Sequence, residues 1–232
     1  MPTLLLSTAY MAPIEYYAHL YAAGHAVEDR GEHYVKQTFR NRCYIATPNG
    51  PQALTLPVVR TGAAHMATRD IRLSDHGNWQ HLHWNALVSA YDNSPYFEYY
   101  ADDFRRIYER KYEFLVDFNA DLRQLILEEL SLDLPIAVSD TYVDATPSED
   151  FTDLRQVLSP KAQPCVPGET SSTGFCARPY YQVFAERTGF LPNLSMADLL
   201  FNMGPESRLV LRNALHQPEV HTQGNLPTQP SL

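Results

Sequence analysis

A short basic segment carries the residues best suited to binding chemistry. Lys36, Arg40 and Arg42 fall close together, with the amides of Gln37 and Asn41 between them, in a chain with a formal net charge of −9. On an extended chain the three cations share parity, so they would point to one face. Like charges repel unless an anion lies between them, and the planar fork of arginine grips phosphate or carboxylate with two hydrogen bonds. The segment therefore predicts an anion-binding site.

A second interpretation of these residues stays open at this stage. A basic strand can be solvated and paired with nearby acids, and three candidates precede it: Glu28, Asp29 and Glu32. Such a lattice of ion pairs would need no ligand.

Residues 76–85 form a second candidate segment, which holds both tryptophans and several histidines. His83 is the candidate general acid or base, because imidazole changes charge near neutral pH. Trp79 and Asn85 are candidate substrate contacts, as is Glu206, which lies in a polar turn near the end of the chain and could face a cleft. No metal-ligand spacing is present, so no metal is predicted. Packing of aromatic rings and histidines between a helix and a sheet is the alternative.

The possible nucleophiles are better explained by structural roles. Ser195, with Asp198 three residues later, is typical of a helix N-cap, and no G-x-S-x-G sequence is present. Cys43 alternates with Arg42, so it belongs on the apolar side of its strand, where a thiol is inert. The three cysteines lack a C-x-x-C pair and are expected to be reduced; a bridge between Cys165 and Cys176 is the alternative.

The composition narrows the class of protein. Asp and Glu number 27 against 18 Lys and Arg, which argues against a nucleic-acid binder because that function needs a basic face. No targeting segment is recognisable, and nothing approaches the ~20 apolar residues of a membrane span. A cytoplasmic protein is expected.

Hydrophobic spacing predicts the elements that must position these residues. Strands are expected at residues 3–8, 26–28, 70–74 and 135–139, with a hairpin at 42–58 around Pro48-Asn49-Gly50. Helices are expected at 13–24, from 79 to 90, from 94 to about 109, after a cap at Asn119, at 180–187 and at 195–203. Residues 144–178 have the composition of a long loop. The prediction is a single mixed α/β domain over residues 1–215, with a central sheet, flanking helices and a β-hairpin, followed by a disordered tail at 216–232.

The chain resembles the WbqC-like family, which is named from bacterial O-antigen gene clusters. The resemblance is carried by an ordered set of blocks over most of residues 4–207: Arg40–Ile45, Asn49–Pro51, Leu54–Val58, Trp79–Tyr91, Ser94–Phe97, Gly189–Ser195, Asp198–Asn202 and Gly204–Ser207. It departs from the family near its start. Many members have His-Gln-Pro followed by Tyr and Pro-Trp there, whereas this stretch reads Ser7-Thr8-Ala9-Tyr10-Met11-Ala12-Pro13-Ile14.

The resemblance implies a role in surface-polysaccharide synthesis, with transfer of an amino acid such as glycine to an amino sugar as the implied reaction. Combined with the basic segment, it predicts a transferase that binds a phosphate-bearing small molecule such as a nucleotide sugar. Lys36, Arg40 and Arg42 would hold the anion, Gln37 and Asn41 would orient it, and His83 would be the base. A non-enzymatic binding or assembly protein is the alternative, favoured by the missing His and Trp. A cofactor and the oligomeric state are not predicted.

Overall fold

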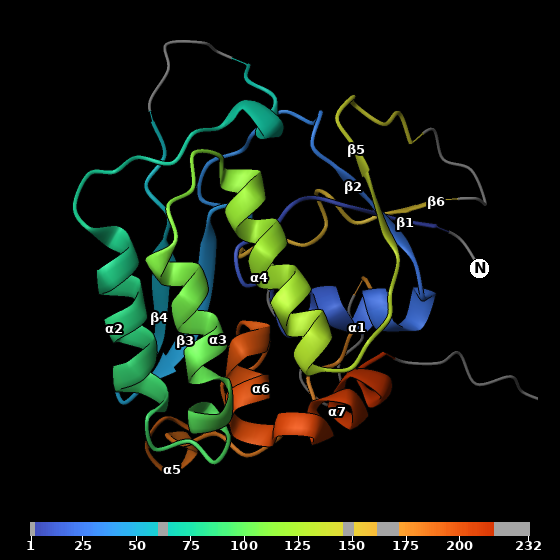
Figure 1. The fold of residues 1–232 in the computed structure, drawn as a ribbon. Helices are drawn as coiled ribbons and strands as arrows, with labels where there is room; N and C mark the ends of the chain where they lie inside the picture. Colours follow the sequence, from blue (N-terminus) through green and yellow to red (C-terminus); the bar gives the residue numbers. More distant parts are fainter. Residues whose placement is uncertain (1–2, 60–64, 146–150, 162–171, 216–232) are drawn as a thin grey trace, which may run out of the picture.

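A parallel sheet of four strands forms one part of the molecule, and a separate hairpin forms another (Figure 1). The computed structural model describes residues 3–59, 65–145, 151–161 and 172–215. The sheet has the order β5-β2-β1-β6, and each neighbouring pair is parallel. Its strands are β1 (Thr3–Leu6), β2 (Ala26–Asp29), β5 (Ile136–Ser139) and β6 (Phe151–Asp153). The predicted mixed α/β class is confirmed.

The central strand β1 is apolar throughout its buried part. Leu4, Leu5 and Leu6 are all buried, because a strand inside a parallel sheet has both faces covered and reads as a continuous hydrophobic run. The hydrogen bond from the Leu154 N–H to the Leu5 carbonyl extends the pairing of β1 and β6 past the end of β6. Strand β1 is therefore the buried inner strand that pairs with both β2 and β6.

The hairpin joins β3 (Arg42–Thr47) to β4 (Gly50–Thr55) through the two-residue turn Pro48–Asn49. Gly50, the first residue of β4 after the turn, has a positive φ of 104°. Cys43 and Ile45 are buried and alternate with half-exposed neighbours, which is the period-two pattern of a strand covered on one face. The predicted hairpin is thus confirmed.

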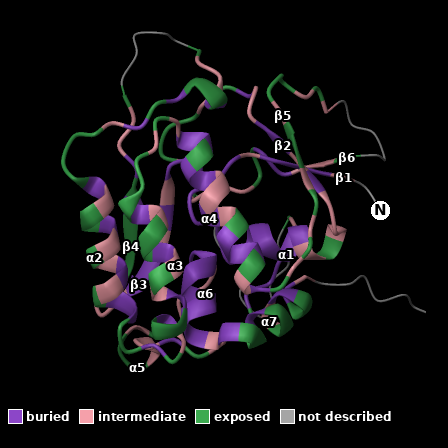
Figure 2. Ribbon diagram, viewed as in Figure 1, coloured by how far each residue is buried: buried purple, intermediate pink, exposed green. Residues whose placement is uncertain are grey.

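The helices contact the hairpin and one part of the parallel sheet. They are α1 (Ile14–Ala23), α2 (Trp79–Tyr91), α3 (Phe97–Glu109), α4 (Leu115–Glu129), α5 (Ala185–Thr188), α6 (Met196–Met203) and α7 (Ser207–Asn213), with 3-10 turns at Thr68–Asp70 and Gly204–Glu206. Helices α2 and α3 lie on the hairpin side, and α1 contacts β1, α6 and α7 (Figure 1). Helix α6 is buried almost along its whole length, whereas α2 and α3 expose their outer faces (Figure 2). Thus the core lies where α6 meets α1, α3 and the hairpin.

Several predicted elements are wrong in their detail. Residues 70–74 form a 3-10 turn and isolated bridges, because Arg72 and Leu73 pair with separate segments instead of one continuous strand. The predicted helix at 180–187 is reduced to α5. The predicted loop 144–178 contains β6, while its residue Cys165 and the tail 216–232 lie outside the described residues.

One predicted helix cap is wrong, and a second stands at the predicted position without its capping bond. Asn119 lies inside α4, where its amide donates to the Arg40 carbonyl (2.8 Å) and to the Thr8 hydroxyl (3.2 Å). Ser195 stands at the N-terminus of α6 but makes no side-chain capping bond. The Asp198 carboxylate accepts hydrogen bonds from two tyrosines instead. The Asn119 amide and the Asp198 carboxylate thus make tertiary contacts, whereas the buried Ser195 hydroxyl has no hydrogen-bond partner among the described residues.

Candidate functional site

The order of the strands marks one place in the sheet as a candidate ligand site. After β1 the chain passes through α1 to β2 on one side, whereas β6, which lies on the other side of β1, comes much later in the sequence. In open parallel sheets, ligands bind outside the carboxyl ends of strands where the order reverses in this way. Here that place is beyond Leu6 of β1 and Asp153 of β6.

A small pocket lies at this reversal, and we call it the switch-point pocket. It is lined by Ser7, Ala9, Pro13, Tyr16, Phe39, Arg40, Leu154, Arg155 and Leu158. The lining residues therefore come from four segments: the chain after β1, the start of α1, the turn before β3 and the chain after β6. The stretch 7–14, where the sequence departs from the family pattern, supplies several of these residues.

Two buried arginines shape the pocket, and both are paired with carboxylates. Arg40 donates to both oxygens of Glu32, with Nε–Oε1 at 2.7 Å and Nη2–Oε2 at 2.6 Å. Arg155 pairs with Asp29 and with Asp153. The Arg40 guanidinium also donates to the Arg155 carbonyl at 3.3 Å, so the two pairs are joined. A lattice of ion pairs therefore surrounds the pocket.

This lattice leaves the pocket without an excess of positive charge. Burial alone would raise the pKa of Asp153, but hydrogen bonds from Arg155 outweigh it and hold that pKa below its usual value. Asp29 is fully buried, and it also accepts the backbone N–H groups of Gly31 and Glu32. A ligand would therefore meet guanidinium groups whose charge is already balanced.

The three predicted cations do not share a face. Residues 36–41 form consecutive turns instead of a strand, and Gln37 has φ of 59°, so the parity argument was wrong. Arg40 turns inward to Glu32, which is the ion-pair alternative. Lys36 is exposed, and Arg42 begins β3. An extended chain would place the three side chains on one face, and the turns at residues 36–41 remove that alternation.

The two predicted amides are also separated. Asn41 is buried and donates its side-chain N–H to the Leu56 carbonyl at 3.2 Å, which ties the turn to the end of the hairpin. Gln37 is exposed. Neither residue is among those that line the switch-point pocket, so their predicted role in orienting an anion has no support from the geometry.

His83 lies away from the switch-point pocket, in the aromatic core beside the hairpin. Its Nδ1 shares a hydrogen bond of 2.9 Å with the Tyr10 hydroxyl, and its ring is stacked on Tyr10 and edge-on to Trp79. Burial lowers the pKa of His83 to about 4, so the imidazole is neutral at physiological pH. Trp79 in turn packs edge-on against Phe118. The packing alternative thus describes both residues.

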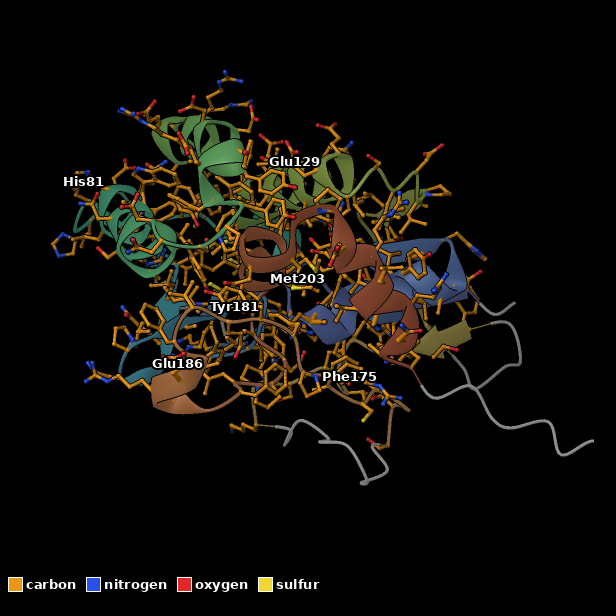
Figure 3. The ribbon with its side chains drawn as sticks, turned by 90° about the horizontal axis from the view of Figure 1, so that it is seen from below. His81, Glu129, Phe175, Tyr181, Glu186 and Met203 are labelled. Atoms are coloured by element: carbon orange, nitrogen blue, oxygen red, sulfur yellow. The ribbon has the colours of Figure 1, made fainter. Side chains whose placement is uncertain are left out.

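The remaining predicted contacts lie on the surface. Asn85 is exposed, with its amide 2.9 Å from His81, which lies at the outer edge of the molecule and points away from it (Figure 3). Glu206 is exposed in the 3-10 turn that follows α6. The structure does not bring either residue to the pocket or to His83.

Sequence reasoning missed the pocket residues that come from β6 and α1. Arg155 follows β6, which lay inside a predicted loop, so its neighbours gave no signal. Tyr16 lies on an expected helix, and only the structure shows that its hydroxyl is buried and close to Arg123. Burial raises the pKa of Tyr16, and nearby Arg123 partly offsets this. The available clue was two acids, Asp29 at the end of β2 and Glu32 just after it.

A second pocket adjoins the first, and we call it the hairpin pocket. It is lined by Phe39, Tyr44, Pro51, Ser159, Pro160, Pro192, Asn193 and Leu194. Phe39 lines both pockets, so the two are neighbours. No charged side chain is among those that line the hairpin pocket.

Over the described ranges, no three His, Cys, Asp or Glu side chains converge as a metal ion would require. In the same part of the chain, no helix has the length and apolar character needed to cross a bilayer. The described thiols, Cys43 and Cys176, are free and buried, and burial raises the pKa of Cys43, which makes it a poor nucleophile.

Comparison with known proteins places the chain in a family. The sequence pattern of the WbqC-like protein family matches residues 8–163, which include most of the switch-point pocket. An uncharacterized protein of Mycobacterium tuberculosis is 31% identical over 199 residues, covering 77% of this chain and 84% of that protein. No solved structure matches the chain. On this evidence the chain belongs to the WbqC-like protein family.

Proposed function

We propose that this protein is a cytoplasmic transferase of bacterial surface-polysaccharide synthesis that acts on a phosphate-bearing activated sugar, such as a nucleotide sugar, in the switch-point pocket. The finer version of this reaction is aminoacyl transfer, for example of glycine, to an amino sugar. The observation that carries the proposal is the position of the pocket, outside the carboxyl ends of β1 and β6 where the strand order reverses. The family resemblance supplies the polysaccharide context.

The polar groups of the pocket suggest how it would work. Carboxylate partners hold Arg40 and Arg155 in place. These guanidinium groups would therefore shape the pocket and orient a polar ligand, and they would not serve as free cations for an anion. The Ser7 hydroxyl bonds the Arg155 carbonyl at 3.3 Å, which is a weak bond that a substrate oxygen could replace. His83 is not assigned the role of base, because it faces Tyr10 in the core.

Filling the pocket tests the proposal without breaking its ion pairs. Ala9 lines the pocket, so Ala9→Phe would occupy it, and Ala22→Phe on the exposed side of α1 is the matched control. We expect the natural chain to bind a nucleotide sugar in calorimetric titrations with UDP-, GDP-, CMP- and dTDP-linked sugars. Affinity should fall by about tenfold or more in Ala9→Phe and stay unchanged in the control.

Folding must be checked alongside binding. If Ala9→Phe lowers the unfolding temperature strongly, the smaller change Ser7→Val replaces it, since Ser7 is only half-buried. Absence of binding by the natural chain to every activated sugar, or equal affinity in Ala9→Phe and Ala22→Phe with both folded, would contradict the proposal.

A second candidate is a non-enzymatic binding or assembly protein. One observation favours it: the guanidiniums in the pocket wall already have carboxylate partners, as expected for a structural lattice. Co-purification from the native host separates the two candidates. A stable protein partner whose binding is blocked by Ala9→Phe, together with no affinity for activated sugars, would favour assembly.

A further inference from the structure

The outer face of the hairpin carries the wall of the hairpin pocket. Arg42 pairs with Thr55, Tyr44 with Ala53, and Ala46 with Pro51 across the two strands. Because side chains directly opposite each other lie on the same face, Tyr44 and Pro51 share the face that also holds Arg42. Tyr44 is positioned firmly, since its carbonyl accepts the Ser195 N–H at 2.9 Å. The aromatic ring and the cation are thus displayed by one rigid element.

Arg42 differs from the arginines of the switch-point pocket in lacking a carboxylate partner among the described residues. Its Nε donates to the Thr55 hydroxyl at 3.0 Å, and no carboxylate of the described residues forms an ion pair with it. Arg40 and Arg155, in contrast, each have acidic partners. Arg42 as a whole residue is half-buried, but its bond to Thr55 lies at the exposed surface, so the guanidinium is open to a ligand while its charge stays uncompensated. Such a group favours an anion as its partner.

The side chains at and beside the two pockets correspond to the parts of a nucleotide. Arg42 is two residues from Tyr44, about 7 Å along a strand. It also directly follows the turn that contains Phe39, the residue common to both pockets. The hairpin pocket thus offers uncharged aromatic and proline groups, Arg42 stands on the same hairpin face as Tyr44, and Phe39 is shared with the switch-point pocket.

We propose that the hairpin pocket binds the nucleoside of a nucleotide-linked donor, with its base against Tyr44 and its phosphate at Arg42. This rests on the proposed transferase function and adds the site that recognises the carrier. A nucleobase of any type can stack its flat ring on tyrosine. The planar guanidinium of arginine donates hydrogen bonds to phosphate oxygens. The sugar carried by the phosphate then extends past Phe39 into the switch-point pocket. A neutral sugar in the hairpin pocket would leave Arg42 without an anion.

Titration with nucleoside diphosphates tests the base contact. The probes are UDP, GDP, ADP and CDP, with inorganic pyrophosphate as the probe that lacks a ring. Tyr44→Ala should weaken the best-bound nucleoside diphosphate by about tenfold or more, whereas Tyr44→Phe should keep most of the affinity because it keeps the ring. Tyr99→Ala, at a tyrosine that is 76% exposed on α3, is the control and should have no effect.

The phosphate contact is tested with a matched pair of cations. Arg42→Gln should weaken nucleoside diphosphates and pyrophosphate alike, and it should flatten the dependence of affinity on salt. Arg208→Gln removes an exposed arginine of α7 that forms no ion pair with the described residues, and it should leave both affinities unchanged.

The outcomes separate this inference from the proposed function. Nucleotide-sugar binding that is lost in Ala9→Phe but unchanged in Tyr44→Ala and Arg42→Gln would overturn the nucleoside site and leave the transferase proposal standing. Nucleoside diphosphate binding that depends on Tyr44 and Arg42, without any preference for a sugar-linked form and without an effect of Ala9→Phe, would keep the site and overturn the transferase. Equal affinity of the natural chain for pyrophosphate and for every nucleoside diphosphate would overturn the base contact.

Discussion

The guanidinium of Arg40 and the carboxylate of Glu32 form a buried pair with two hydrogen bonds. Each residue is 2% exposed, and their two N–O distances are 2.6 and 2.7 Å. Removing one member of such a pair leaves an uncompensated buried charge, which costs far more than losing an exposed ion pair. A substitution of Arg40 therefore reports on the stability of the fold before it reports on any ligand.

We expect Arg40→Ala to lower the free energy of unfolding by about 3–5 kcal/mol. Arg42→Ala, which breaks no ion pair within the described residues, should change it by less than about 1 kcal/mol. Urea denaturation of both variants measures the difference. The double change Arg40→Met with Glu32→Leu should recover much of the loss, because it removes both charges together. Equal unfolding midpoints for Arg40→Ala and Arg42→Ala would contradict the assignment.

Asp198 makes the stability depend on pH. Its carboxylate is fully buried and accepts hydrogen bonds from Tyr91 (2.8 Å), from Tyr180 and from the Gln182 amide (3.2 Å). Burial raises its pKa to about 6 from an ordinary 3.8, although these hydrogen bonds oppose the rise. The folded state thus binds a proton more tightly than the unfolded state, so this group's contribution to stability falls as the pH rises from about 4 to about 6.

The variant Asp198→Asn isolates this effect. The difference between a pKa of about 6 and 3.8 corresponds to about 3 kcal/mol, and the variant should lack this pH dependence. The measurement is the free energy of unfolding of the natural chain minus that of the variant, taken at intervals from pH 4 to pH 7. A difference that stays constant over this range would show that the Asp198 carboxyl has an ordinary pKa.

His83 should act in the opposite direction over an overlapping range. Burial lowers its pKa to about 4 from 6.5, so between these values the unfolded state binds a proton that the folded state does not. Its contribution to stability therefore rises as the pH rises from about 4 to about 6.5, by about 3 kcal/mol in total. The comparison of the natural chain with His83→Gln measures it. The His83 imidazole proton resonance is identified as the one missing in His83→Gln. A titration of that resonance near 6.5 in the folded protein would refute this assignment.

Gly31 holds open the space beside the Asp29–Arg155 pair. A β-carbon at Gly31 would overlap the backbone of Thr141 and Tyr142, whose neighbour Val143 bonds both members of the pair. We expect Gly31→Ala to lower the unfolding free energy by about 2 kcal/mol or more, because backbone must move. Gly24→Ala, where φ is 75° and the space is open, should cost only about 1 kcal/mol. Thermal unfolding compares the two, and equal losses would refute the predicted overlap.

Elements with a strong local pattern could be predicted from the sequence. The helix α1 begins directly after Pro13 and ends at Gly24, whose φ of 75° needs glycine, and both boundaries were recognised. The hairpin was recognised from Asn49-Gly50 and the alternation of Cys43 and Ile45. In these places the local sequence alone determines the backbone.

The candidate site depends on distant contacts and could be predicted only in part. β6 has three residues and no apolar run, so its pairing with β1 left no local signal. The parity of Lys36, Arg40 and Arg42 assumed an extended chain, but residues 36–41 form turns and Arg40 pairs with Glu32. The acids near this segment were recognised as an alternative partner set. The sequence does not show which acid meets which arginine, because that depends on how β2 and β6 pack beside β1.

The parallel pairing of β1 with β6 sets a limit on when the pocket can exist during folding. Ser7 and Arg155, which are hydrogen-bonded to each other in the pocket wall, are 148 residues apart. Contacts of such long range form slowly, since most of the chain must be ordered before the two ends meet. On the ribosome the hairpin and α1 are complete long before β6 emerges. The pocket must therefore be among the last parts to form, and pulse-labelled hydrogen exchange should show late protection of the Leu154 N–H, which bonds Leu5.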